Sequence, residues 1–90
     1  MFRLGRRRRT PGLTVLTLEG PSALPRVGIV AGKKVGNAVN RNRAKRRLRE
    51  AASRAGLEAH TDYILIAGPE CNDVGFTDLV ETISGRTSGA

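Results

Sequence analysis

The sequence predicts an α+β fold in which a small sheet packs against helices as a two-layer sandwich. Three observations lead to this prediction. Two apolar runs with strand periodicity precede a long helical segment, a third apolar run follows that segment, and a shorter helical segment comes last. Each such element has an apolar face to bury against another. Ninety residues suffice for one modest core. We therefore expect a single domain over residues 1–90, in the order partial α-β-β-α-β-α.

Three segments have the composition of strands. Residues 13–18 alternate apolar side chains with threonine, and residues 26–31 form a second short apolar run after a loop marked by Pro21 and Pro25. Residues 62–67 contain five consecutive apolar side chains, from Tyr63 to Ala67. An unbroken run of this kind is typical of a central strand that is covered on both faces.

The longest helical pattern lies between Asn37, which can cap its first turn, and Gly56, which can end it. The intervening segment has neither glycine nor proline, and its apolar residues share one face: Ala44, Leu48, Ala51, Ala52 and Ala55. The cations are expected on the other side or along the flanks: Arg41, Arg43, Lys45, Arg46, Arg47 and Arg54. A last helix is expected to begin with Thr77 as its cap and to end at Gly85.

Charge is distributed unevenly along the chain. The net charge is +8, but residues 1–50 hold fourteen Lys and Arg against Glu19 and Glu50, whereas residues 51–90 are acidic on balance. Solvated helix faces usually interleave acids with bases, yet Glu50 is the only acid between residues 32 and 50. Such uncompensated charge predicts a polyanionic partner. Arginine outnumbers lysine, and arginine favours bidentate contact with phosphate.

RNA is the favoured polyanion. No short helix with a tight turn precedes residues 38–55, which disfavours a DNA-binding helix-turn-helix. Aromatic residues for base stacking are few, so phosphate contacts should dominate. Residues 32–36 are expected as a flexible basic loop. Residues 1–12, with the run Arg6–Arg9, are expected as a basic arm or helix fragment that adds an auxiliary RNA contact, and residues 86–90 as a disordered tail.

Residues 33–50 resemble the signature of the bacterial ribonuclease P protein component. The matching pattern is dense and specific: Lys33-Lys34-x-Gly36-x-Ala38-Val39-x-Arg41-Asn42-Arg43-x-Lys45-Arg46-x-x-Arg49-Glu50. The resemblance extends from about Phe2, in a stretch similar to the end of the family's first helix, to Ile83. It departs in three places. Most of that first helix is missing ahead of Phe2, so the chain looks like a short, N-terminally truncated member; leucines replace frequent strand aromatics; and Gly68 stands where arginine is common.

The resemblance implies a fold, a function and a set of contacts. The fold is an α/β sandwich with a left-handed βαβ crossover, although crossovers are nearly always right-handed. The function is that of the protein subunit of ribonuclease P, which removes the 5′ leader of precursor tRNA with Mg²⁺ held by the RNA subunit and no catalytic residue in the protein. The implied RNA-binding residues are Lys33, Lys34, Arg41, Asn42, Arg43, Lys45, Arg46 and Arg49. The implied leader-binding residues are Phe2, Lys45 and Arg49.

The other residues with reactive side chains predict structural roles. Cys71 is the only cysteine, which excludes an internal disulfide and a cysteine zinc site. His60 is the only histidine and has no evident acid–base partner. Four acids that could suggest a metal cluster are expected in turns and caps instead: Asp62, Glu70, Asp73 and Asp78. With no membrane-length apolar run and no signal peptide, the sequence predicts a cytoplasmic protein.

Two other functions stay open from the residues alone. One is a non-catalytic RNA- or DNA-binding module, such as a ribosomal accessory protein, because a fold of this kind does not by itself define a function. The other is a stand-alone metal nuclease, which would cleave RNA without an RNA subunit. The expected partners are the ribonuclease P RNA subunit and precursor tRNA, with no membrane and no required protein oligomer.

Overall fold

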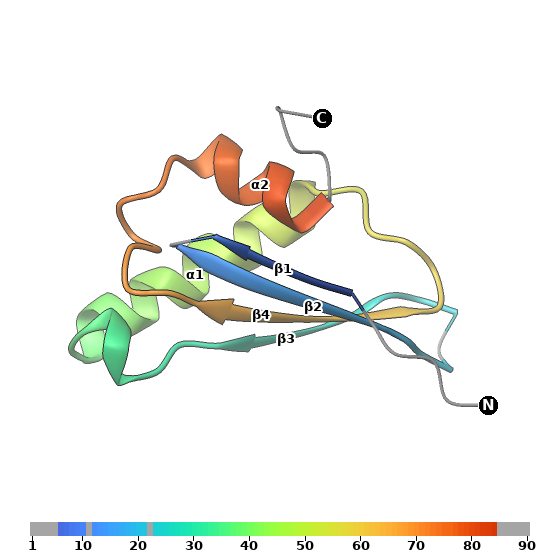
Figure 1. Cartoon of the computed structure of the whole chain (residues 1–90), viewed down its shortest axis with the longest axis horizontal. Helices are drawn as coiled ribbons and strands as arrows, with labels where there is room; N and C mark the ends of the chain where they lie inside the picture. Colours follow the sequence, from blue (N-terminus) through green and yellow to red (C-terminus); the bar gives the residue numbers. More distant parts are fainter. Residues whose placement is uncertain (1–5, 11, 22, 85–90) are drawn as a thin grey trace.

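In the computed structural model, a four-stranded sheet packs against two helices (Figure 1). The structure describes residues 6–10, 12–21 and 23–84. The elements, in chain order, are β1 (Arg6–Thr10), β2 (Leu13–Glu19), β3 (Arg26–Val30), a 3₁₀ turn η1 (Lys33–Val35), α1 (Ala38–Arg54), β4 (Thr61–Ala67) and α2 (Phe76–Ser84). The predicted α+β class and two-layer arrangement are confirmed. Phe2 and the tail at 86–90 lie outside the described residues.

The strands lie in the order β1-β2-β4-β3. β2 is antiparallel to both β1 and β4, whereas β3 and β4 are parallel. The chain passes from β3 through α1 back to β4, which is the βαβ unit that the resemblance implied. The handedness of this unit stays a prediction.

Both helices pack on one face of the sheet. Leu13 pairs with Ala67 and Val15 with Leu65, so these four residues share a face, and all are buried. They join one core with residues from both helices: Leu48, Ala51, Leu79 and Ile83. The alternate residues of β4, Ile64 and Ile66, point the other way and are only half-buried. Within the described residues the prediction that β4 is covered on both faces is therefore wrong, because both described helices pack on the same face.

We call the other side of the sheet the open face. The strand register places the following residues on it: Arg7, Arg9, Thr14, Leu16, Leu18, Arg26, Gly28, Val30, Asp62, Ile64 and Ile66. Its centre is apolar, and two arginines of β1 lie along one edge. No element of the described chain covers it.

β1 is the main departure from the sequence prediction, because residues 6–10 form a strand where a basic arm or helix fragment was expected. A short turn joins β1 to β2. In this turn the Thr10 hydroxyl donates to the Leu13 carbonyl at 3.0 Å, and the Leu13 N–H is 3.2 Å from the same hydroxyl oxygen. Gly12 is required by close approach, since a Cβ there would collide with the Val74 side chain.

Arg8 attaches β1 to the end of α2. Its guanidinium donates to the carbonyls of Thr82 and Ile83, each at 3.0 Å. The last carbonyls of a helix have no partner within the helix, so these bonds cap α2 and compensate its negative end. Pairing with β2 and these two bonds of Arg8 together hold the arginine-rich strand in place.

The predicted bounds of α1 are nearly correct. The Asn37 side chain accepts a hydrogen bond from the Asn40 N–H at 3.0 Å and caps the helix, as predicted. The helix ends at Arg54 with Ala55 as its C-cap, just before Gly56. α2 begins at Phe76, so Thr77 lies inside the first turn. The prediction that Thr77 caps this helix is therefore wrong. Among the described residues, no helix combines the length and apolarity needed to cross a membrane.

Candidate nucleic-acid interface

α1 packs on the sheet with one side and presents its cations on the others. Arg41, Lys45 and Arg49 follow one another at four-residue spacing, which places them along one flank about 6 Å apart. Arg43 and Arg46 lie further out, on the side facing away from the sheet. We call six residues together the α1 cationic surface: Arg41, Asn42, Arg43, Lys45, Arg46 and Arg49. Four of them are exposed, and Arg41 and Lys45 are half-buried.

The charge of the α1 cationic surface is not neutralised within the described chain. In residues 6–10, 12–21 and 23–84, none of its side chains makes an ion pair or hydrogen bond. The nearest acid in the sequence, Glu50, pairs instead with Arg54, at 3.4 Å. Like charges held together without relief repel one another, so this surface is suited to a polyanion.

Arg47 does not belong to this surface, although the sequence analysis placed it with the exposed cations. Its guanidinium donates to the carbonyl of Asn72 at 2.8 Å and to the carbonyl of Val74. Asn72 in turn donates from its side chain to the Asn40 carbonyl at 3.0 Å. Arg47 lies on the flank of α1 that faces the loop before α2, and it fastens that loop to the helix.

Arg54 also lies on the α2 side of the helix. Besides its exposed pair with Glu50, its guanidinium lies 5.6 Å from the centre of the Phe76 ring. This is a cation–π distance. Arg47 and Arg54 therefore have partners within the protein, whereas the five cations of the α1 cationic surface make no ion pair or hydrogen bond with the described residues.

Lys33 and Lys34 lie in η1, where the sequence predicted a flexible loop. The Val35 N–H donates to the Gly32 carbonyl and the Gly36 N–H to the Lys33 carbonyl, each at 3.1 Å. Val35 is buried, and Gly36 has a φ of 127°, which favours glycine. The turn is thus held at both ends, and both lysine side chains are exposed.

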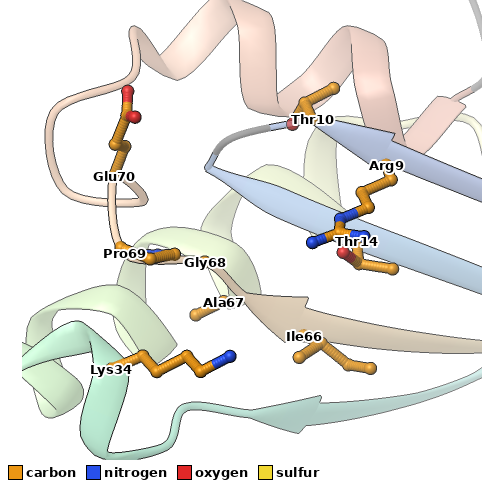
Figure 2. A pocket seen from close by; sticks show the side chains of 9 residues that line it. All are labelled: Arg9, Thr10, Thr14, Lys34, Ile66, Ala67, Gly68, Pro69 and Glu70. Carbon is orange, nitrogen blue, oxygen red and sulfur yellow. The ribbon is translucent and has the colours of Figure 1, made fainter.

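A hollow of about 570 Å³ lies at the carboxyl end of β4 (Figure 2). Its lining includes Arg9 from β1, Thr14 from β2, Lys34 from η1, and Ile66, Ala67 and Pro69. Sequence reasoning missed it because these segments are far apart along the chain and meet only through the sheet order. The one available signal was the pair of cationic runs at residues 6–9 and 33–34.

The titratable groups Asp62, Cys71 and His60 lie outside the α1 cationic surface and the hollow, and their surroundings are those of structural residues. Arg26 donates to both Asp62 oxygens, at 2.9 and 2.7 Å, and these hydrogen bonds lower the pKa of the Asp62 carboxyl. Burial raises the pKa of the Cys71 thiol. His60 is exposed in a turn, with a φ of 58°. Within the part of the chain that the structure describes, no three His, Cys, Asp or Glu residues are placed to hold a metal ion.

Comparison with protein families and known sequences identifies relatives of the chain. The profile of the family described as Ribonuclease P matches residues 1–87. The chain is 46% identical over 83 residues to the ribonuclease P protein component of Thermus aquaticus, covering 91% of this chain and 49% of that protein. It is 49% identical over 65 residues to that of Bartonella quintana, covering 68% and 48%. The chain thus spans about half the length of these curated relatives.

Solved structures with the same fold are also ribonuclease P proteins. The protein from Thermotoga maritima matches with a TM-score of 0.71 and 27% identity, over 87% of this chain and 76% of that one. The protein from Staphylococcus aureus matches with a TM-score of 0.70 and 28% identity, over 87% and 73%.

Proposed function

Because the chain belongs to the ribonuclease P protein family, we propose that it acts as the protein subunit of a bacterial ribonuclease P. In this role it binds the RNA subunit and the 5′ leader of precursor tRNA, in the cytoplasm. It assists endonucleolytic removal of the leader, which gives tRNA its mature 5′ end. The RNA subunit carries out the catalysis, and the protein alone is inactive.

The observation that carries this proposal is the α1 cationic surface. Its five charged side chains have no acidic partner within the described chain, and the helix that displays them is capped at Asn37 and anchored by Leu48. Preorganised cations of this kind bind RNA phosphates and release the counterions condensed on them. Lys33 extends the same contact from the start of the helix.

Contact with the leader is assigned to Lys45, Arg49 and Phe2. Lys45 and Arg49 are one helical turn apart on the flank of α1 that faces away from α2, so both can contact the same strand. Phe2 lies outside the described residues, and its role is taken from its position in the family pattern.

Ribonuclease P is a metal-dependent ribonucleoprotein, and we assign its Mg²⁺ to the RNA subunit. The described part of the protein does not offer a fitting cluster of ligands. Bound by RNA, Mg²⁺ would supply activation of water and charge stabilisation at the leaving oxygen. The protein's own contribution is electrostatic, since its cations reduce the repulsion between the RNA subunit and the precursor as they come together.

Reconstitution tests the proposal. Adding the protein to the cognate RNA subunit at low Mg²⁺ is expected to increase precursor cleavage, and no gain would refute the proposed function. Crosslinking supplies a second measurement. If it recovered ribosomal RNA and none of the ribonuclease P RNA, a ribosomal accessory role would replace this one.

Arg43→Gln tests the surface itself, with Arg54→Gln as a matched control on the same helix. Loss of one phosphate contact should lower the slope of log affinity against log salt by about 0.7–0.9 for the RNA subunit. The control should keep the slope, because Arg54 lies outside the α1 cationic surface. Equal slopes for wild type and Arg43→Gln would remove Arg43 from the interface.

A further inference from the structure

Val39 is an apolar side chain that the fold leaves uncovered. It lies in the first turn of α1 and is 67% exposed. Within the described residues, it is the only large apolar side chain of either helix that is exposed. The others are buried or packed against the core: Leu48, Phe76, Leu79, Val80 and Ile83. Packing within the described chain therefore does not account for a valine at this position.

The helix itself gains nothing from a valine here. A β-branched side chain loses χ1 freedom in a helix, and valine is a weaker helix former than alanine, lysine or arginine. At an exposed position, no packing compensates for this weakness. Because single exposed apolar residues are common on protein surfaces, the neighbours of Val39 decide whether its exposure has a use.

Val39 lies at the centre of the outward face of α1. Each residue of an α-helix is turned by about 100° from the one before it, so Leu48, nine residues on, points the opposite way, into the core. Arg43 and Arg46, four and seven residues on, share the face of Val39. Both arginines are exposed, and neither makes an ion pair or hydrogen bond with the described residues. A polyanion that is bound by these two arginines therefore lies against Val39.

The first turn of α1 holds Val39 in place before any partner binds. The Asn37 side chain caps the Asn40 N–H at 3.0 Å, and the Arg41 N–H donates to the Asn37 carbonyl at 2.9 Å. On the flank towards α2, the Asn72 side chain donates to the Asn40 carbonyl at 3.0 Å. A valine in a helix has one strongly preferred rotamer. A contact made by Val39 therefore costs little conformational entropy.

We propose that Val39 packs against ribose and base edges in a minor groove of the RNA subunit, while Arg43 and Arg46 bind the phosphates beside it. The minor groove of A-form RNA is wide and shallow and displays these groups, whereas side chains cannot read the deep, narrow major groove. Phosphate contacts carry no sequence information. An apolar contact requires a groove of matching shape, so Val39 determines specificity. This inference rests on the proposed function, because it describes how the same helix recognises the RNA subunit.

Affinity for the cognate RNA subunit tests the contact. Val39→Ala removes two methyl groups and should weaken binding about 10-fold. The slope of log affinity against log salt should stay at the wild-type value, because no phosphate contact is lost. Leu24→Ala is the matched control, since Leu24 is 75% exposed and lies in the loop before β3, at the opposite end of that strand from η1. This control should bind like wild type. Equal affinities of Val39→Ala and wild type would overturn the inference.

Duplex DNA of random sequence is the second ligand, because nonspecific binding to it depends on phosphate contacts. Val39→Ala should bind this duplex like wild type at the same salt concentration. A loss of equal size on RNA and DNA would overturn the inference, since the substitution would then act on α1 as a whole. The Tm of Val39→Ala should equal or exceed that of wild type, because alanine is the better helix former. A clearly lower Tm would contradict the premise that Val39 is uncovered within the protein.

Two outcomes separate this inference from the proposed function. A wild-type protein that does not stimulate precursor cleavage at low Mg²⁺ would refute the proposed function, and the inference would fall with it. A protein that stimulates cleavage while Val39→Ala binds the RNA subunit like wild type would keep the function and lose only the role of Val39.

Discussion

Replacing Arg47 by methionine should destabilise the protein, because the substitution removes two hydrogen bonds while keeping most of the side chain's length. The guanidinium donates to the carbonyls of Asn72 and Val74 and joins α1 to the loop before α2. A hydrogen bond to a charged group contributes about 1.5–3 kcal/mol. Because Arg47 is half-buried, water can partly replace its bonds, so we take the lower value for each and expect a loss of about 3 kcal/mol.

The loss should be large on the scale of the whole domain. Small proteins are stable by about 5–15 kcal/mol. For a domain of this size, about 3 kcal/mol lowers Tm by about 12–24 °C. Urea unfolding, followed by circular dichroism at several temperatures, measures both quantities.

Arg46→Met is the matched comparison, because Arg46 is the neighbouring residue on the same helix and has no partner in the described chain. Its stability should stay within about 0.5 kcal/mol of wild type. Its salt slope for the RNA subunit should fall by about 0.7–0.9, and Arg47→Met should largely keep its slope at temperatures where it is folded. The reasoning is refuted if Arg47→Met unfolds at the wild-type urea concentration. It is also refuted if Arg46→Met loses stability while Arg47→Met loses salt slope.

Three further predictions concern the core and the titratable groups. Leu48→Ala should lower the free energy of unfolding by about 2–5 kcal/mol, since Leu48 is fully buried; weaker RNA binding with unchanged stability would contradict this. Arg26 lowers the pKa of Asp62 in the folded state, so the pair stabilises the protein above the ordinary carboxyl pKa, about 3.9, and this contribution is lost as pH falls through the lowered value. Asp62→Asn should therefore unfold with a flatter dependence on acid pH, and an identical acid profile would argue against the pair. Cys71 is buried and burial raises its pKa, so iodoacetamide should label it slowly in the native protein and rapidly in urea; equal rates would show that the site opens readily.

The parts of the fold that could be predicted are those with local causes. Asn37 can cap a helix wherever it precedes one, and the apolar spacing around Leu48 fixes which side of α1 is buried. The strands β2, β3 and β4 were visible as apolar runs for the same reason. The prediction for β1 was wrong because its four arginines carry no apolar alternation, and a strand forms there only through pairing with β2 and the cap that Arg8 provides.

The candidate site divides in the same way. The sequence by itself determined that a dense cationic segment runs along a capped helix and that its pattern resembles a known RNA-binding family, since both depend on neighbours within a few residues. Only the tertiary structure decided which cations are available to a partner. Arg8 and Arg47 stabilise the fold because backbone carbonyls of other segments accept their hydrogen bonds. Arg9 and Lys34 line one hollow because the sheet order brings together residues that are 25 positions apart. Hydrogen bonds and contacts between residues so far apart in the sequence depend on how the sheet and helices pack, and no single segment determines that packing.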